Sequence, residues 1–529
     1  MEKRQCIESG STCLGIELGS TRIKAVLIDR SGKVLAVGFH DWENSLLDGI
    51  WTYSLEEIHA GLRACYRSLK EAVEKEYGCR LRTVGAMGIS AMMHGYMAFD
   101  KEGTLLSPFQ TWRNSNTEEA ADRLTALFRF NIPLRWTIAH LYQCVLDKEE
   151  HLRQLSFVTT LASYIHFLLT GVKCSGIGDA AGIFPIDSGA LDYDARMVSQ
   201  FDGLLSDRGY GWTLRDVLPQ VLTAGTEAGK LSEAGAAFLD PEGELRPGIP
   251  FCPPEGDAGT GMVATNAVAP ATGNVSAGTS TFAMLVLSRG LSKLYREIDM
   301  VTTPDGYPVA MAHANNGTSD LNAWVGLFRE CLTLFGVQAD STELYGRLYR
   351  HSLEGDKDCG ALLPYGYYSG EGITHLNEGR PLFVRKPDSA FTLSNFMRAH
   401  LYSSLGAVKL GLDILLKEEK LPVKKLTGHG GLFKTKGVMQ RYLAAAANAP
   451  VTVMETASEG GPWGMALLAA YLLYGKERAS LSDYLEQEIF RNRVGVTEQP
   501  DPQDTAGFER FMEDYRAGLE IERAATGWK

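Results

Sequence analysis

The sequence has no long hydrophobic run and no regularly spaced pair of cysteines. Its longest apolar run, residues 465–474, falls far short of the roughly 20 residues that a helix needs to span a bilayer. The nine cysteines are scattered, odd in number and never spaced as Cys-x-x-Cys, so neither a zinc motif nor a disulfide framework is indicated. The first residues also lack the apolar core of a secretory signal. We therefore expect a soluble, cytoplasmic protein with free thiols and no membrane partner.

Positive charge is scarce as well. The chain has 52 Lys and Arg against 64 Asp and Glu, which gives a formal net charge of −12. A protein without a basic excess cannot neutralise many phosphates, so nucleic acid is not an expected partner. With 529 residues, 45% of them hydrophobic, the chain exceeds what one hydrophobic core usually serves. We therefore expect two large domains.

Two segments far apart in the chain share one pattern. Residues 15–21 read Gly-Ile-Glu-Leu-Gly-Ser-Thr, and residues 274–280 read Asn-Val-Ser-Ala-Gly-Thr-Ser. In each, an apolar strand runs into a glycine and two hydroxyl residues, and a second apolar strand follows, which predicts a β-hairpin. Backbone N–H groups and hydroxyls at such a turn form an anion site, although a single hairpin can also be a plain turn. Two copies predict a duplicated domain that holds ATP from both sides.

The two hairpins contain the candidate phosphate-binding residues. Glu17 precedes the first turn, and a carboxylate there can hold a hydrated Mg²⁺, which keeps several waters and takes only one or two protein carboxylates. ATP and Mg²⁺ are therefore the expected cofactors. The candidate residues are Gly19, Ser20, Thr21 and Lys24 in the first hairpin, and Gly278, Thr279 and Ser280 in the second.

The pattern after the first hairpin is typical of an α/β protein. Apolar residues recur at helical spacing over 55–73, with Ser54 and Glu57 as a capping box before them and Tyr77-Gly78 after them. A strand is predicted over 83–90, which completes the order hairpin, helix, strand. A boundary near residue 263, after a Pro-rich approach, predicts domains over 1–263 and 264–529. In the second half we expect helices over 393–417 and 438–448, a strand over 451–454, and a glycine-rich loop over 460–464 before an alanine-rich helix.

Asp257 is the candidate catalytic base. It stands at a glycine-flanked turn, within Pro-Glu-Gly-Asp-Ala-Gly-Thr-Gly over 254–261, close before the second hairpin. A carboxylate at this position can accept the proton of a hydroxyl that attacks phosphate. The alternative is a helix cap.

Two further groups of residues suit a sugar and a nucleoside. Met93 and His94 follow the strand that begins near residue 83, and strand ends in open α/β sheets are where ligands bind. Together with Trp112, Arg113 and Asn114, they offer hydrogen bonds and a flat apolar face for a polyhydroxylated substrate; the alternative is a surface histidine and a packed tryptophan. The glycine clusters at 428–433 and 459–464 let the backbone approach adenine and ribose, or they simply terminate helices.

Taken in order, these motifs resemble the FGGY family of carbohydrate kinases, in the superfamily of sugar kinases, actin and Hsp70. The likeness covers residues 15–474, and Leu363-Pro-Tyr and Gly370-Glu371 look like further family landmarks. It implies an α/β fold of two ribonuclease H-like (actin-like ATPase) domains, duplicated, with an interdomain cleft. It also implies transfer of the γ-phosphate of ATP to a sugar hydroxyl. The closest likeness is to the ribulokinase and xylulokinase branch, so the expected substrate is a ketopentose such as L-ribulose or xylulose.

The resemblance also implies roles for individual residues. Asp257 becomes the general base and, with Glu17, a metal ligand, whereas Met93 and His94 become part of the sugar pocket. The adenosine motif becomes Gly428, Gly430, Gly431 and Leu432. The chain departs from the family at Glu17 and Asn114, where aspartate is usual or common, and the family's Pro-Lys-x-x-Trp-x-x-Glu-Asn stretch is not recognisable around 141–150. The last two departures concern the sugar rather than the reaction.

Two other classes of function were weighed against a kinase. A non-catalytic ATP switch or chaperone-like protein shares the duplicated hairpins, but Met93-His94-Gly95 and Asp257 resemble the kinases. A dinucleotide oxidoreductase is suggested by loose Gly-x-Gly-x-x-Ala matches at 176–181 and 259–264, yet neither clearly follows a strand in a βαβ unit, and no Walker A motif is present. We expect a monomer or homodimer with a small sugar as its substrate.

Overall fold

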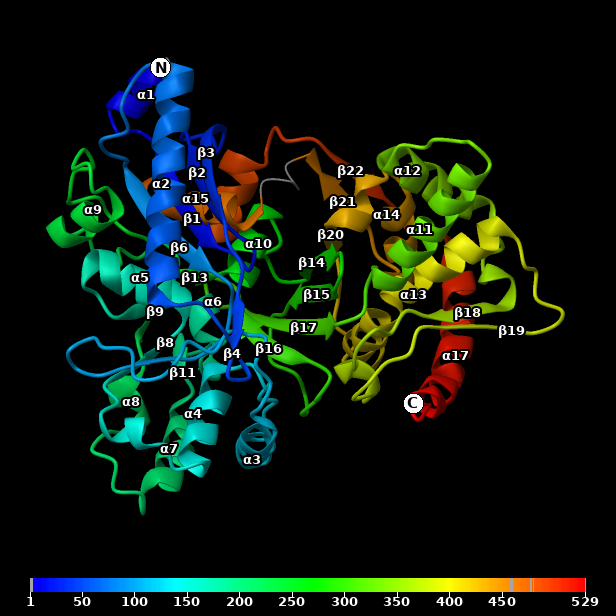
Figure 1. Cartoon of the computed structure of the whole chain (residues 1–529), viewed down its shortest axis with the longest axis horizontal. Helices are drawn as coiled ribbons and strands as arrows, with labels where there is room; N and C mark the ends of the chain where they lie inside the picture. The colour runs from blue at the N-terminus through cyan, green and yellow to red at the C-terminus, as the bar shows by residue number, and fades with distance from the viewer. Residues whose placement is uncertain (1–2, 456–459, 476–477, 479, 529) are drawn as a thin grey trace. The chain divides into compact units, whose positions relative to one another are not determined.

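The computed structural model describes residues 3–455, 460–475, 478 and 480–528. The protein is α/β, and its chain forms two compact units (Figure 1). Unit 1 contains Met1–Val268, Met300–Val309 and Glu459–Asn492; unit 2 contains Ala269–Asp299, Ala310–Ser458 and Arg493–Lys529. The expected domains over 1–263 and 264–529 stay a prediction, and unit 1 differs from the first of them because it takes two segments from later in the chain.

Unit 1 contains both strands and helices. Its strands are β1 (Cys13–Leu18), β2 (Arg22–Ile28), β3 (Val34–Asp41), β4 (Ser45–Leu47), β5 (Ile50–Thr52), β6 (Ala86–Ala91), β7 (Met97–Phe99), β8 (Phe157–Thr159), β9 (Cys174–Gly176), β10 (Ile186–Asp187), β11 (Asp192–Tyr193), β12 (Gln220–Leu222) and β13 (Glu255–Gly256). Its helices are α1 (Lys3–Glu8), α2 (Leu55–Tyr77), α3 (Glu118–Phe128), α4 (Thr137–Leu146), α5 (Leu161–Thr170), α6 (Ile177–Ala180), α7 (Ala195–Leu205), α8 (Leu214–Val217), α9 (Glu233–Leu239), α10 (Asp257–Ala264), α15 (Gly460–Tyr474) and α16 (Leu481–Tyr484).

Unit 2 is also mixed, with longer helices. Its strands are β14 (Thr272–Ala277), β15 (Thr281–Val286), β18 (Leu362–Tyr365), β19 (Leu382–Arg385), β20 (Lys425–His429), β21 (Val451–Met454) and β22 (Gly495–Glu498), and β16 (Asp299–Thr302) and β17 (Pro308–Ala314) have residues in both units. Its helices are α11 (Ser319–Leu334), α12 (Ser341–His351), α13 (Leu393–Asp413), α14 (Val438–Ala447) and α17 (Pro502–Ala525).

The main sheet of unit 1 has five strands in the order β13-β6-β1-β2-β3. Side chains alternate along β1, so Leu14, Ile16 and Leu18 enter the hydrophobic core on one face while Gly15 and Glu17 face the other. α2 packs on β2 and β3, and α15 packs on β1 and β6. The approach of α15 is close, because a Cβ on Gly15 would lie 2.2 Å from the Pro462 carbonyl oxygen. A segment late in the chain therefore completes the first unit.

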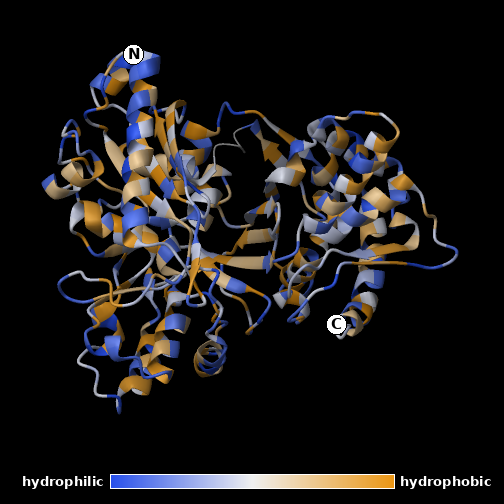
Figure 2. Ribbon diagram, viewed as in Figure 1, coloured by the Kyte–Doolittle hydropathy of each residue, from blue (hydrophilic) through white to orange (hydrophobic). Residues whose placement is uncertain are grey.

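The helix predicted after the first hairpin is confirmed. α2 begins after Ser54, whose capping box with Glu57 is present, and ends at Gly78 in the left-handed conformation with φ of 61°. Figure 2 shows both hydrophilic and hydrophobic residues on this helix, and its buried residues recur at the three- and four-residue spacing of an amphipathic helix. The strand predicted over 83–90 is β6, which begins at Ala86 and ends at Ala91.

Both predicted hairpins are present, and each belongs to the same local arrangement. β1 pairs antiparallel with β2 and parallel with β6; β14 pairs antiparallel with β15 and parallel with β20. The turns are closed by backbone hydrogen bonds from Gly19 N to Arg22 O (3.0 Å) and from Gly278 N to Ser280 O (3.0 Å). The two units therefore repeat one hairpin-plus-parallel-strand motif.

One predicted loop is wrong. Residues 460–464 form the first turn of α15, not a loop. Pro462 fits there because the first helical turn needs no N–H donor from that residue, and the neighbouring glycines allow the helix to lie close to β1. Glu459, the first residue of that predicted cluster, lies outside the described residues. The other predicted elements of the second half appear as α13, α14 and β21.

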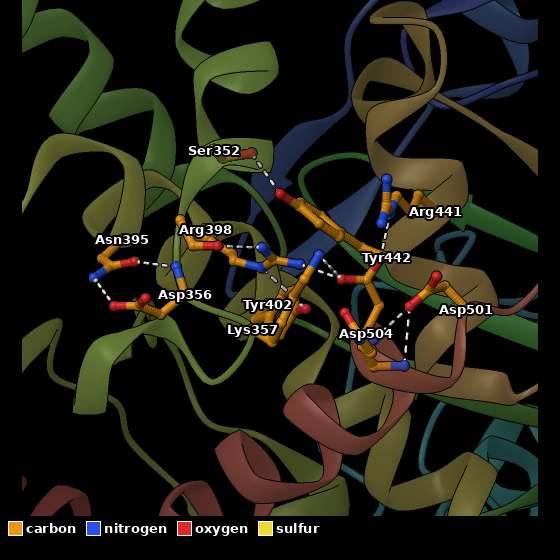
Figure 3. Close-up of polar contacts among 12 residues, drawn as sticks. Ser352, Asp356, Lys357, Asn395, Arg398, Tyr402, Arg441, Tyr442, Asp501 and Asp504 are labelled. Carbon is orange, nitrogen blue, oxygen red and sulfur yellow. Dashed lines mark hydrogen bonds and ion pairs between the residues drawn. The ribbon is translucent and has the colours of Figure 1, made fainter.

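A buried charge cluster fastens the C-terminal helix of unit 2 (Figure 3). Asp504, in the first turn of α17, lies 2.7 Å from a guanidinium nitrogen of Arg398 and 2.7 Å from Nζ of Lys357, and it also pairs with Arg441. The side chains of Arg398 and Asp504 are both 0% exposed. Asp501 caps the same helix by accepting hydrogen bonds from Gln503 N and Asp504 N. The cluster therefore ties α13, α14 and α17 together.

The cysteines are free thiols, as expected from their spacing. Cys331 is the exposed one among the nine. In the ranges that the structure covers, none of the helices combines the length and the apolar character needed to cross a bilayer.

Candidate active site

Glu17 and Asp257 form the centre of the candidate site in unit 1. Glu17 lies near the end of β1, on the face that α15 covers, and its Oε2 has no hydrogen-bond partner among the described residues. Desolvation raises the pKa of Glu17 to about 8, and the negative charge of Asp257 adds to this rise. Lys24, the cross-strand partner of Glu17, and the Thr260 hydroxyl act in the opposite direction. Two carboxylates close enough to repel each other fit the donor set of a hydrated Mg²⁺.

Asp257 is held by the backbone of the neighbouring strand. β13 pairs parallel with β6, with Gly256 opposite Ala91, so Asp257 emerges beside the segment that follows β6. Its Oδ1 accepts a hydrogen bond from Met93 N at 3.1 Å. Asp257 is the first residue of α10, whose N-cap is Gly256 without a side-chain cap, so its carboxylate is not the helix cap considered above. The Asp257 carboxylate is therefore held in position by Met93 N and is not used to cap α10.

The surroundings of Asp257 alter its protonation. Desolvation raises the pKa of its carboxyl, although the hydrogen bond from Met93 N opposes the rise. Asp257 is nevertheless exposed to solvent. A carboxyl group that is accessible, yet a stronger base than usual, is suited to accept a proton from a bound hydroxyl.

Met93 and His94 lie directly beside this carboxylate. His94 has a φ of 72°, a conformation that is uncommon for a residue with a side chain, and Gly95 continues it with a φ of 95°. A Cβ on Gly182 would lie 2.7 Å from His94 Nδ1, and one on Gly256 would lie 2.9 Å from Met93 Cγ. The backbone at 182 and 256 therefore has to be glycine for both side chains to keep their places.

The other predicted sugar-side residues, Trp112, Arg113 and Asn114, contact neighbouring segments of unit 1. Trp112 donates a hydrogen bond from Nε1 to Ser20 Oγ at 3.1 Å, which joins its segment to the turn of the first hairpin. The guanidinium of Arg113 lies 3.9 Å from the ring centre of Trp51. Asn114 exchanges hydrogen bonds with the backbone of Trp51, accepting at 2.9 Å and donating at 2.8 Å. The Asn114 amide therefore uses these hydrogen bonds to hold the backbone of β5.

Aromatic side chains hold the turn of the first hairpin. Trp42 donates from Nε1 to Gly19 O at 2.7 Å, and the Tyr53 hydroxyl donates to Ser20 O at 2.6 Å. Because the carbonyl groups of Gly19 and Ser20 accept hydrogen bonds from these side chains, the turn is held in a fixed conformation.

Unit 2 has its own pocket around the second hairpin. The cavity has a volume of about 960 Å³, and its wall includes Gly278 and Thr279 from the hairpin and Gly431 and Leu432 from the predicted adenosine motif. α11 with its N-cap, α12 and the segment after Leu432 supply the rest, including Asn322, Tyr345, Tyr349, Arg350, Lys434 and Lys436. This volume lies within the usual range of small-ligand pockets.

The remaining glycines of the predicted adenosine motif are not among the residues that line the pocket. A Cβ on Gly428 would lie 2.3 Å from the Phe433 ring, and Gly430, with a φ of 100°, would meet Ala277 O at 2.6 Å. Both are glycines because β20 and the following turn pack tightly. Ser280 is not among the pocket-lining residues; its hydroxyl donates to Asn315 O at 3.4 Å.

Sequence reasoning missed two buried carboxylates near Asp257. Asp179 is fully buried, and its Oδ2 accepts hydrogen bonds from Thr160, Ser163 and Ser175 at 2.5–3.2 Å. Burial raises the pKa of Asp179 to about 6 and that of Glu255 well above its ordinary value. The only signal for Asp179 was the Gly-x-Gly-x-x-Ala match at 176–181, which pointed to another function.

The architecture defines the class of protein. Two units that each contain an antiparallel hairpin extended by a parallel strand have the duplicated actin-like ATPase fold. The structure resembles a ligand-bound xylulose kinase from Lactobacillus acidophilus with a TM-score of 0.78 and 18% identity, over 98% of this chain and 99% of that one.

Sequence comparison then defines the family. Residues 12–263 match the N-terminal domain, and residues 273–473 the C-terminal domain, of the FGGY family of carbohydrate kinases. The chain belongs to this family and is a sugar kinase that uses ATP. It is 22% identical to the xylulose kinase of Haemophilus influenzae over 85% of this chain and 89% of that one. It is 26% identical to the xylulose kinase of Escherichia coli over 36% of this chain and 40% of that protein. The chaperone-like alternative finds no support among these relatives.

Proposed function

We propose that this sugar kinase phosphorylates a ketopentose, xylulose or L-ribulose, with Asp257 as the general base. The observation that carries the proposal is the Asp257 carboxylate, accessible to solvent, raised in pKa and held by Met93 N beside His94. The relatives named xylulose kinase support the ketopentose, as does the likeness to the xylulokinase branch noted from the motifs. Met93, His94, Trp112, Arg113 and Asn114 are the proposed substrate-side residues.

The proposed reaction moves one proton and one phosphoryl group. As the sugar oxygen bonds to the γ-phosphorus of ATP, its proton passes to the Asp257 carboxylate, the bond to the β-phosphate oxygen breaks, and ADP leaves. A base of this kind contributes about 10²–10⁴-fold to the rate. Alignment of the hydroxyl with the phosphate supplies the larger share.

Glu17 and Asp257 are the residues that would hold Mg²⁺. A bound Mg²⁺ neutralises the negative charge of the phosphates. Two observations support this assignment. Glu17 Oε2 has no hydrogen-bond partner among the described residues, and a cation between Glu17 and Asp257 would offset the repulsion of their negative charges. The charged form of Glu17 is favoured once a cation is beside it.

The nucleotide is assigned to both hairpins. We propose that Gly278, Thr279, Ser280 and the adenosine-motif residues Gly428, Gly430, Gly431 and Leu432 handle ATP in unit 2, and that Gly19, Ser20, Thr21 and Lys24 handle its phosphates in unit 1. The pocket of about 960 Å³ beside Thr279 and Gly431 supports the unit 2 part.

The test is Mg-ATP consumption, coupled to ADP detection, across ketopentoses, ketohexoses and polyols. A strong response to one ketopentose, absent in Asp257→Asn, is the expected result. A preference for a ketohexose or polyol would overturn the substrate and keep the reaction. An unchanged turnover of Asp257→Asn would remove the base.

A further inference from the structure

A compact group of metal-ligand side chains lies away from the carboxylate pair, at the end of α4. Cys144 is in the last turn of this helix, and His151 lies in the short 3₁₀ helix over Glu150–Arg153. Between them the chain folds back, with Glu149 N donating to Cys144 O at 3.0 Å. One donor atom each from Cys144, Glu149 and His151 lie within 4.8 Å of one another.

The imidazole of His151 is oriented from both sides. One ring nitrogen, Nδ1, lies 3.1 Å from Glu149 Oε2, and the other, Nε2, lies 3.0 Å from the Tyr96 hydroxyl. A histidine that binds a metal usually uses one nitrogen for the metal and has the other fixed by a hydrogen bond to a second group. Tyr96, which is fully buried, supplies that second group here.

We propose that Cys144, Glu149 and His151 bind a transition-metal cation of the zinc type, at a site distinct from the Mg²⁺ ligands. A thiolate, an imidazole nitrogen and a carboxylate oxygen are the three kinds of ligand that Zn²⁺ takes in proteins, and a water completes four-coordination. Mg²⁺ and Ca²⁺ prefer oxygen ligands alone, so this donor set selects against them. On binding, the sulfur–metal bond replaces the S–H bond of Cys144 and its proton passes to solvent; no redox change occurs.

The distances are compatible with this assignment. Zinc bond lengths of about 2.0–2.3 Å place tetrahedral donor atoms roughly 3.4–3.6 Å apart. The separation of 3.1 Å between His151 Nδ1 and Glu149 Oε2 is already close to that value. Side-chain rotation of Cys144 and Glu149 has to close a gap of at most about 1.2–1.4 Å, since no donor pair exceeds 4.8 Å.

Access and rigidity also fit a cation site. The side chain of Glu149 is 47% exposed, so a cation has a path from solvent, whereas that of His151 is 10% exposed and Cys144 is buried. Cys144 lies in α4 and His151 in the 3₁₀ helix, and Glu149 is the N-cap residue in the short segment between them. The spacing Cys-x₄-Glu-x-His is not a familiar zinc motif, so a search of the sequence for Cys-x-x-Cys does not find this cluster.

The experiment titrates the whole purified protein with Co²⁺ in excess Mg²⁺ and follows cobalt–thiolate absorption. Mg²⁺ occupies the carboxylate pair, and only a site with a sulfur ligand gives the thiolate band. The expected result is one Co²⁺ per chain with that band, displaced by Zn²⁺. Cys144→Ser abolishes the band, and Tyr96→Phe weakens Co²⁺ binding by about 10–100-fold because it releases the imidazole. Cys331→Ser, which removes the exposed thiol, leaves the titration unchanged.

The opposite results are equally clear. No thiolate band in the wild type, a band that survives Cys144→Ser, or one lost in Cys331→Ser overturns the site. Should Cys144→Ser fail to fold, Glu149→Gln decides, because its side chain is half exposed and an unchanged Co²⁺ affinity contradicts the assignment. Sugar phosphorylation by the same variants is measured separately, so failure of the metal site and failure of the proposed kinase substrate are distinguishable.

Discussion

Glu17 occupies the space that a side chain on residue 461 would need: a Cβ on Gly461 would lie 1.6 Å from Glu17 Oε2. Glu17 reaches this point because it faces α15, whose first turn contains Gly461. The longer carboxylate at position 17 and the glycine at position 461 are therefore two parts of one arrangement.

Gly461→Ala is expected to displace the Glu17 carboxylate and to weaken the Mg²⁺ dependence of the kinase. Adding Glu17→Asp shortens the acid by one methylene and should recover part of the loss, so the two changes are non-additive. The measurement is the apparent Mg²⁺ affinity and kcat of both single variants and the double variant. Gly203→Ala in α7 is the control, because nothing lies within 4 Å of the added Cβ. Strictly additive effects would contradict the coupling.

Asp257→Asn is expected to lower kcat at least ~10²-fold while ATP still binds. The amide cannot accept the hydroxyl proton, but it keeps the size of the carboxylate and can still accept the hydrogen bond from Met93 N. Steady-state kinetics together with calorimetric ATP binding separate the two effects. Loss of ATP binding in parallel with turnover would point to a role in the nucleotide site.

The stability of the Mg²⁺-free protein should fall as pH rises from about 4.5 towards 8, through the titration of Glu17. Its pKa in the folded state is about 8, above the ordinary 4.5, so the folded protein binds the proton more tightly than the unfolded chain. The stabilisation is complete below the unfolded pKa and is lost as pH rises through the folded one. Glu17→Gln should flatten the dependence of Tm on pH over this range, and Mg²⁺ should reduce it in the wild type. A profile identical in the variant would show that Glu17 titrates normally.

Thr279→Ala is expected to raise the KM for ATP and leave that for the sugar nearly unchanged. Thr279 lines the unit 2 pocket together with Gly431, so loss of its hydroxyl removes a donor beside the proposed nucleotide. Thr333→Ala is a matched control on the exposed side of α11, where the hydroxyl donates to Arg329 O. Equal effects of the two variants would argue against the pocket.

Asp504→Ala should destabilise unit 2 by about 3–5 kcal/mol, because Arg398 would be left buried without its partner. Asp501→Ala, which removes only the cap of the same helix, should cost about 1 kcal/mol. Denaturant unfolding compares the stabilities of the two variants.

Burial alone would raise the pKa of Asp504, but hydrogen bonds from Lys357 and Arg441 outweigh the effect of burial and the pKa is lowered. The stabilisation is therefore present above the ordinary aspartate pKa and lost as pH falls through the lowered value.

The parts of the fold that the sequence predicts are those fixed by neighbouring residues. The capping box at Ser54 and Glu57 and the two glycine turns depend on contacts within a few positions, so they are readable from the chain. The glycine-flanked position of Asp257 can also be seen in the sequence, and its role as a base stays a prediction. The hydrogen bond from Met93 N to Asp257 cannot be predicted from the sequence, because it depends on the parallel pairing of β6 with β13.

The rest depends on packing between distant segments. The sequence of residues 460–464 predicts a loop because glycine and proline disfavour helix interiors. In the structure this segment is helical and packs closely against β1 at Gly15, a contact between distant segments that the local sequence does not reveal. The environment of Asn114 is likewise set by the backbone of Trp51, which no local pattern reveals. The sequence shows Glu17 as a departure from the family pattern, but its fit against Gly461 is visible only in the structure.

Cys331 gives this enzyme a built-in labelling position. The other cysteines are buried, so a thiol-reactive fluorophore should attach to the native chain at one site without mutagenesis. That site is on α11, nine residues and therefore about 13 Å along the helix from Asn322, which lines the unit 2 pocket. A dye placed there should report by fluorescence, in the unmodified sequence, the binding of the nucleotide that is proposed for this pocket.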